Sequence, residues 1–195
     1  MTAQPSIRRM LSADWKQEWT DDGRQFVAVV LIALVALAVG YGAKTIATSS
    51  TRTVSSGGVS ASIPTPWLYQ PGAQDLLFTA VDPRNPGQRY SVSKASNGGT
   101  DTGSVADATV AAKSRVLGEF QVLGRGTTSV NGKDAPNVTY VYVTTRNGAV
   151  PQVIEGRDVF IQASSGVLVV TLESPTKSFE NALDTFGTFA ASVRG

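Results

Sequence analysis

The chain has 195 residues, contains no cysteine and no histidine, and carries 17 basic against 15 acidic side chains. Without these two residue types it has no thiolate or imidazole for catalysis, and it lacks the usual ligands of zinc, copper, haem and iron–sulfur clusters. The net charge of +2 is too small, and the basic residues are too scattered, to indicate nucleic-acid binding. Carboxylate chemistry, a Ser-Lys arrangement and a hard cation held by oxygen ligands remain open to such a chain. No motif in the sequence favours any of them, so we expect no cofactor, no metal site, no catalytic residue and no nucleic-acid partner.

The N-terminal segment, residues 1–25, has an amphipathic pattern in which Trp15 and Trp19 fall on the apolar stripe. This pattern predicts a short helix in the cytoplasmic headgroup region, or a segment that docks on a partner membrane subunit. Together with the ends of the apolar run that follows, it defines the expected membrane-interface residues: Trp15, Trp19, Arg24, Tyr41 and Lys44.

An uncharged apolar run occupies residues 26–43 (FVAVVLIALVALAVGYGA). As an α-helix, these eighteen residues would span about 27 Å, close to the hydrocarbon thickness of a bilayer. We expect a single transmembrane helix, in contact with membrane lipid. Small residues at short spacings would let it pack closely against integral membrane subunits, although lipid contact alone tolerates them as well. These residues are Ala28, Ala33, Ala36 and Gly40.

The orientation of this helix follows from its flanks, because Lys and Arg are more frequent before the run than directly after it. We expect a cytoplasmic N-terminus, with residues 44–195 in the periplasm or on the outer face of the cell membrane. The alternative is a cleaved signal peptide. The leader before the run is long and contains acidic residues such as Asp14 and Glu18, which favours the uncleaved anchor.

Residues 44–58 are rich in Ser, Thr and Gly, which is typical of a flexible linker. Beyond them, alternating apolar residues and turn signals predict short strands joined by hairpins, with Asn131-Gly132 and Asn147-Gly148 as two of the turns. We expect these strands at residues 59–63, 76–81, 90–94, 120–122, 126–130, 135–145, 150–161 and 167–173.

Two helices are expected among these strands. The first covers residues 104–117, begins at Ser104 as its cap, and has this predicted apolar face: Val105, Ala108, Ala112, Val116 and Leu117. The second covers residues 178–193, begins at Ser178, and has this apolar stripe: Phe179, Leu183, Phe186, Phe189, Ala190 and Val193. Hairpin-joined strands with one inserted helix and one closing helix predict an α+β fold for a single extracytoplasmic domain, residues 59–195.

Two short segments stand out within this order of elements. They are SIPTPW at residues 62–67 and ESPTKSF at residues 173–179, the latter followed by Phe186, Phe189 and Ser192. With them, residues 54–195 resemble the Mog1/PsbP-type fold. The resemblance implies an antiparallel sheet with two packing helices in an α/β/α sandwich, and binding or accessory roles more often than enzymatic ones. The chain departs from the photosynthetic members in its anchor and its lack of histidine, so no functional residue is transferred.

One sequence pattern is shared with enzymes. Ser91 and Lys94 have the S-x-x-K spacing of serine acyl enzymes, in which both residues lie on a helix. Here they fall on an expected strand, where side chains three residues apart point to opposite faces. We therefore do not expect an enzyme.

We expect a non-enzymatic, single-pass accessory subunit or assembly factor of a bacterial membrane complex, which binds partners through its span and its outer domain. The alternative is a membrane-tethered module that holds a lipid or a glycan in a cavity between the sheet and a helix. The aromatic residues that would line such a cavity are Trp67, Phe78, Tyr140 and Phe186. For Trp67, packing in the core is the favoured interpretation.

Overall fold

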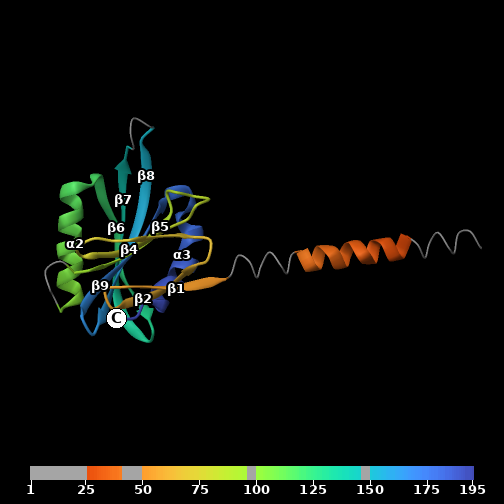
Figure 1. The fold of residues 1–195 in the computed structure, drawn as a ribbon. Helices are drawn as coiled ribbons and strands as arrows, with labels where there is room; N and C mark the ends of the chain where they lie inside the picture. The colour runs from red at the N-terminus through yellow and green to blue at the C-terminus, as the bar shows by residue number, and fades with distance from the viewer. Residues whose placement is uncertain (1–25, 41–49, 96–99, 146–149) are drawn as a thin grey trace, which may run out of the picture. The chain divides into compact units, whose positions relative to one another are not determined.

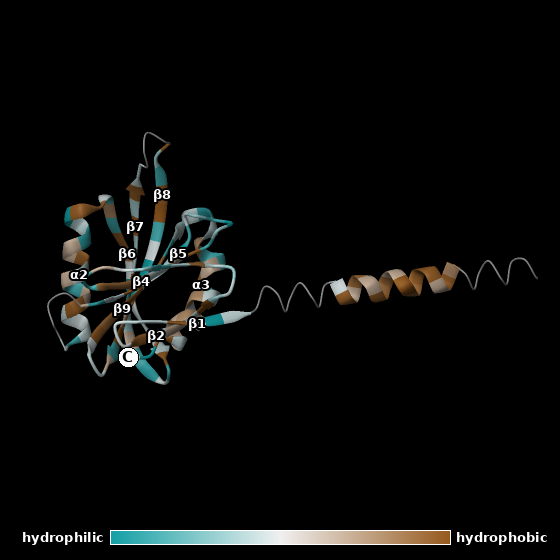
Figure 2. Cartoon of the chain, in the orientation of Figure 1, coloured by the Kyte–Doolittle hydropathy of each residue, from teal (hydrophilic) through white to brown (hydrophobic). Residues whose placement is uncertain are grey.

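A computed structural model describes residues 26–40, 50–95, 100–145 and 150–195. The chain divides into two compact units, Met1–Ser49 and Ser50–Gly195. In the first unit, residues 26–40 form a helix whose side chains are exposed and mostly hydrophobic (Figure 2). The predicted packing residues Ala28, Ala33, Ala36 and Gly40 all lie on this helix.

Within the described residues, no helix has both the length and the apolar character that crossing a membrane requires. The five predicted membrane-interface residues lie outside the described ranges, as does the predicted turn at Asn147-Gly148. Those predictions, and the boundaries of the N-terminal segments, therefore stay predictions.

The unit from Ser50 to Gly195 is built on antiparallel sheets (Figure 1). A separate hairpin joins β1 (Thr51–Ser56) to β2 (Val59–Pro64). The remaining strands form one sheet of seven, in the order β3-β4-β5-β9-β8-β7-β6. They are β3 (Leu68–Pro71), β4 (Leu76–Val81), β5 (Arg89–Lys94), β6 (Gly118–Val130), β7 (Lys133–Thr144), β8 (Gln152–Ala163) and β9 (Gly166–Pro175).

Two helices pack on opposite faces of the seven-stranded sheet, as Figure 1 shows: α2 (Thr102–Val116) and α3 (Thr176–Ser192). The central strand β9 is buried on both faces, which explains its nearly continuous apolar run. Leu168, Val170 and Leu172 face α3, whereas Val167 and Val169 face α2. The predicted α+β arrangement of antiparallel strands with two packing helices is confirmed.

The main core lies between the sheet and α3 and is rich in aromatic rings. Tyr90 of β5 lies between Trp67 and Phe189, with ring centroids 4.4 and 4.6 Å apart. Trp67 is therefore a core residue, which is the interpretation that the sequence favoured over the lining of a ligand cavity. The predicted stripe of the closing helix is also confirmed, because Phe179, Phe186 and Phe189 are all buried.

The segment predicted as a linker contains a strand. Residues 51–56 form β1, and the chain then turns through Gly57 and Gly58, which both have positive φ. Ser and Thr suit a flexible linker and a half-exposed hairpin equally well, so composition alone did not separate the two. The short strand β3 was also missed, since only four residues carry it.

The predicted cap of the inserted helix was wrong, and its predicted face was right only at Val105 and, in part, at Leu117. Val105 and Ala106 are the buried residues of α2, whereas Val116 is 79% exposed. The N-cap is Asp101, whose carboxylate accepts hydrogen bonds from the backbone N–H and the hydroxyl of Ser104. The inward stripe was hard to recognise because its last buried turn carries Lys113, a charged residue, in place of an apolar one.

Candidate functional site

The face of the sheet that carries α2 is only partly covered. α2 packs on β6, β7 and β8, and an open cleft extends from β4 and β5 to the adjoining ends of β7 and β8. The cleft has two adjoining parts of about 700 and 540 Å³, which share Pro86 and Arg89. We call the whole depression the Arg89 cleft.

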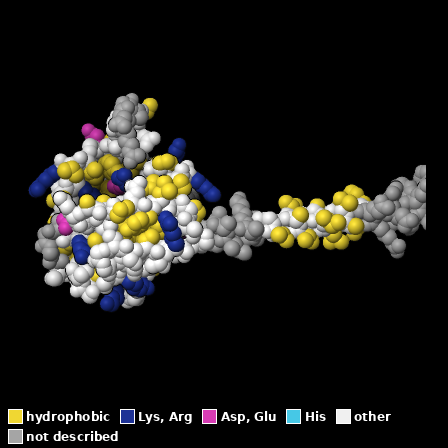
Figure 3. Space-filling model, in the orientation of Figure 1, with side chains coloured by type: hydrophobic (Ala, Val, Ile, Leu, Met, Phe, Trp, Pro, Cys, Tyr) yellow, Lys and Arg dark blue, Asp and Glu magenta, His cyan; other side chains and the backbone are white. Residues whose placement is uncertain are grey.

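The larger part of the Arg89 cleft is formed by three segments: the β4–β5 loop, the β7–β8 hairpin and the start of α3. It is lined by Asn85, Pro86, Gly87, Arg89, Tyr142, Thr144, Val150, Gln152, Val153, Ile154, Pro175, Thr176 and Lys177. The smaller part lies over β4 and β5 and is lined by Gln70, Leu76, Thr79, Val81, Pro86, Arg89, Ser91 and Glu173. Apolar and polar side chains thus alternate around an open depression, and Figure 3 shows the same mixture on the visible face of the domain.

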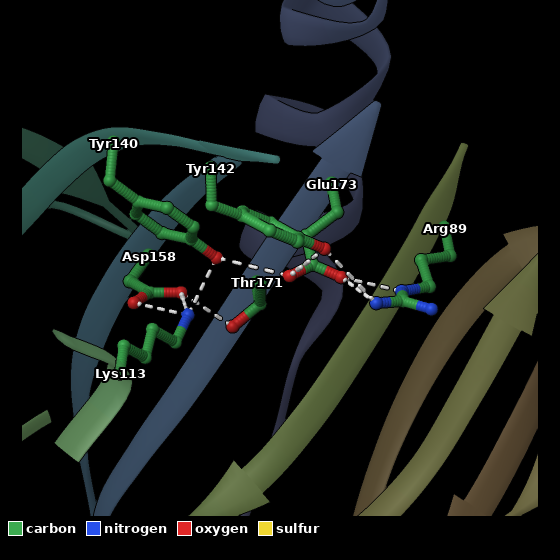
Figure 4. A network of polar contacts seen from close by, with 7 residues as sticks. All are labelled: Arg89, Lys113, Tyr140, Tyr142, Asp158, Thr171 and Glu173. Carbon is green, nitrogen blue, oxygen red and sulfur yellow. Dashed lines mark hydrogen bonds and ion pairs between the residues drawn. The ribbon is translucent and has the colours of Figure 1, made fainter. Parts of the chain in front are cut away.

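A charged pair occupies the floor of the cleft. Arg89 of β5 and Glu173 of β9 are direct cross-strand partners. The Nε atom of Arg89 donates to Glu173 Oε2 at 2.5 Å, and its Nη2 atom forms an ion pair with the same carboxylate (Figure 4). The Glu173 side chain is only 11% exposed, whereas that of Arg89 is 37% exposed. Arg89 is therefore the member of the pair that a ligand in the cleft would meet.

Tyrosine hydroxyls connect this pair to a second one beneath α2. Tyr142 and Tyr140, both on β7, donate to Glu173 Oε1 at 3.2 and 3.4 Å. The Nζ atom of Lys113 donates to the Tyr140 hydroxyl at 2.6 Å and to both carboxylate oxygens of Asp158 at 2.8 Å. Figure 4 shows the resulting chain of contacts, which joins residues of β5, β9, β7, β8 and α2.

Asp158 is the most deeply buried member of this network. Its side chain is 1% exposed, and it receives a further hydrogen bond of 2.7 Å from Thr171, its cross-strand partner on β9. Among the described residues, no buried side-chain nitrogen or oxygen lacks a hydrogen-bond partner. The network is thus fully satisfied, which makes it rigid rather than reactive.

The protonation of the network also argues against catalysis. Burial, with the nearby Glu173 carboxylate next, raises the pKa of Tyr142 to about 12. Burial, with Asp158 next, raises the pKa of Tyr140 well above its ordinary value. For Arg89, burial lowers the pKa, but Glu173 and the two tyrosines outweigh it, so that the net shift is upward. At neutral pH both tyrosines are neutral donors, not bases or nucleophiles.

The four aromatic residues predicted to line one cavity do not lie together. Trp67, Phe78 and Phe186 are in the core on the α3 side, whereas Tyr140 belongs to a cluster on the α2 side. None of the four lines either part of the Arg89 cleft. The expectation failed because the sheet lies between Tyr140 and the other three rings, which pack in the core beside α3.

The remaining motif behaves as the strand context predicted. Ser91 and Lys94 both lie on β5, so that no helical turn brings them together. Ser91 lines the smaller part of the cleft.

The charged members of the network were not predicted as site residues. Glu173 follows the apolar run of β9, Asp158 lies at a buried position of β8, and Lys113 lies on the inward face of α2. A charge inside a buried run is a recognisable signal, because such a group is rarely buried unless it is paired. The partners, however, lie 45 and 84 residues away along the chain.

The chain matches no protein-family model and no curated protein. Solved structures of similar fold include the Ran-binding protein Mog1p of Saccharomyces cerevisiae, with a TM-score of 0.50 and 10% identity, over 74% of this chain and 95% of that one. Cyanobacterial PsbP from Synechocystis sp. PCC 6803 has a TM-score of 0.48 and 16% identity, over 75% of this chain and 92% of that protein. LpqN of Mycobacterium tuberculosis, involved in cell envelope biogenesis, has a TM-score of 0.46 and 16% identity, over 74% of this chain and 90% of LpqN.

These likenesses concern the fold alone. The domain has a Mog1/PsbP-like α+β fold, as its sequence resemblance implied. None of these three proteins is more than 16% identical to this chain, so no function is transferred by the likeness.

Proposed function

We propose that this protein is a single-pass, non-enzymatic accessory subunit or assembly factor of a bacterial membrane complex. Residues 26–43 anchor it in the cell membrane and pack against the helices of a partner subunit. The α+β domain lies on the outer face and binds a partner protein through the Arg89 cleft. The uncharged run at residues 26–43 supports the anchor, and the open cleft supports the docking surface.

The observation that carries the docking proposal is the state of Arg89. Two of its nitrogens are held by Glu173 and Tyr142 at the floor of an open depression, yet more than a third of its side chain stays exposed. A positioned, partly exposed arginine beside apolar side chains is typical of a protein-binding surface, since such residues lose little entropy when a partner binds.

Lipid or glycan binding in a cavity between sheet and helix is the weaker candidate. Its expected lining is taken up by the core, where Trp67 contacts Tyr90 and Phe78 contacts Phe189. We therefore base the proposal on protein binding.

Purification in mild detergent through a tag on Gly195 tests the proposal. We expect a stoichiometric membrane partner with the wild-type chain. Val153→Asp places a charge in the cleft at a 49% exposed valine and should release the partner. Val122→Asp is the matched control, since Val122 is also on a strand and 39% exposed but does not line the cleft. Recovery of the wild-type chain alone would refute the proposal.

A further inference from the structure

We infer that the Arg89 cleft takes an extended, acidic peptide segment of the partner, with a carboxylate seated between Arg89 and Lys177. This inference deepens the proposed function and rests on it, because it concerns the same cleft. It adds the chemical class of the bound segment.

The charges of the cleft favour an anion. Among the residues that line its larger part, Arg89 and Lys177 are the charged ones, and both are basic. The acid of the smaller part is Glu173, whose carboxylate is largely buried and already accepts from Arg89 and both tyrosines. A segment in the cleft therefore meets net positive charge. The first turn of α3, which contains no acid, adds a partial charge of the same sign at the rim.

The hydrogen bonding of Arg89 leaves one edge of its guanidinium available. Its Nε and Nη2 atoms donate to Glu173 and Tyr142, while no hydrogen bond from its Nη1 atom is found within the described residues. Because Glu173 holds the group in place, a second carboxylate finds these N–H donors already oriented. Lys177, in the first turn of α3, is exposed, lines the same part of the cleft and supplies the second cation.

The rest of the lining favours a peptide over a free phosphate or a lipid headgroup. Apolar contacts come from Pro86, Val153, Ile154 and Pro175, while Gln152 and Thr144 present groups that hydrogen-bond to a peptide backbone. An extended peptide presents side chains and backbone groups in alternation, which matches such a surface. A phosphate site would instead gather several cations around one point.

The test uses the full-length chain in detergent micelles and a displayed library of random peptides. We expect the selected peptides to be enriched in Asp or Glu between apolar residues. For one selected peptide, Lys177→Glu should weaken binding about tenfold, the size expected when an exposed attractive pair becomes a repulsive one. Arg115→Glu is the matched control, because Arg115 is exposed on α2 and does not line the cleft. Exchanging the acid of the peptide for lysine should restore binding to Lys177→Glu.

Several results would overturn the inference: no enrichment, enrichment of neutral or basic peptides, an equal loss with Arg115→Glu, or displacement of the peptide by phosphatidylserine vesicles. Failure of the inference differs from failure of the proposed function. A membrane partner that survives Lys177→Glu but is lost with Val153→Asp keeps the docking surface and removes its acidic preference. A wild-type chain that binds acidic peptides but purifies alone keeps the peptide preference of the cleft and refutes the proposed membrane partner.

Discussion

The ring of Tyr140 lies across Gly156, its cross-strand partner on β8, in the space that a side chain would otherwise occupy. A Cβ atom on Gly156 would overlap Cζ, Cε2 and the hydroxyl oxygen of the tyrosine. This arrangement lets the Tyr140 hydroxyl reach over β8 and contact both Lys113 and Glu173. A glycine inside a strand usually weakens it, but here it makes the polar network possible.

Gly156→Ala should therefore displace the Tyr140 ring and destabilise the domain by about 1–3 kcal/mol, the usual cost of overpacking a buried site. Urea unfolding followed by circular dichroism measures the change. Gly124→Ala is the control, because a Cβ there meets no atom within 4 Å. Equal stability of the two variants would show that the ring relocates at no cost.

Lys113→Met should destabilise the domain by roughly 3–5 kcal/mol, because it leaves the buried carboxylate of Asp158 without its cation. The double variant Lys113→Met/Asp158→Asn should regain part of this loss, since an asparagine oxygen still accepts from Thr171. Arg125→Met breaks an ion pair of two exposed side chains, with Asp107, and should cost less than about 1 kcal/mol. Similar costs for Lys113→Met and Arg125→Met would contradict the burial argument.

Alkaline pH should weaken the fold through Tyr142. Its pKa in the folded chain, about 12, lies above the ordinary value of 10 that applies after unfolding. A raised folded pKa stabilises the folded state at pH values below 10, and this contribution is lost as the pH rises from 10 through 12. We expect the urea midpoint to fall over this window, and Tyr142→Phe to reduce the dependence. If the urea midpoint of Tyr142→Phe falls with pH as steeply as that of the wild type, Tyr142 is not the group responsible. A smaller pH dependence that remains in this variant is assigned to Tyr140, whose pKa is also raised.

Acid should weaken the start of α2 through its cap. The hydroxyl and the backbone N–H of Ser104 lower the pKa of Asp101 below its ordinary value of 3.8. A lowered folded pKa stabilises the fold above pH 3.8, and the contribution is lost as the pH falls through the folded value. Asp101→Ala should lower the thermal midpoint at pH 7, and the difference should shrink in acid. Asp75→Ala, an exposed acid outside any helix, is the control.

The anchor is tested by extraction of membranes at alkaline pH. The full-length chain should remain in the membrane pellet, because about twenty apolar residues are enough to hold a helix in the bilayer. Replacing Leu34 and Leu37 by lysine should move the chain to the supernatant. A mature wild-type chain that begins beyond residue 40 and is found in the soluble fraction would instead indicate a cleaved signal peptide.

Much of the fold could be predicted because its signals are local. The Asn131-Gly132 pair forms the expected turn, with φ values of 54° and 76° that suit these two residues. The apolar stripe of α3 follows directly from helical spacing. Errors arose where local signals were ambiguous, as in β1, or were displaced by a buried charge, as at Lys113 of α2.

By itself, the sequence determined the element types, the α+β class and the absence of thiolate and imidazole chemistry, since composition and short-range periodicity decide these properties. Only the tertiary structure decided which charges meet. β9 is inserted between β5 and β8, and this strand order brings Arg89 beside Glu173 although 84 residues separate them. In the same order β4 and β5 lie away from the strands on which α2 packs, and part of the cleft lies over them. Strand pairing depends on the balance of the whole core, so no local pattern encodes the cleft or its charged floor.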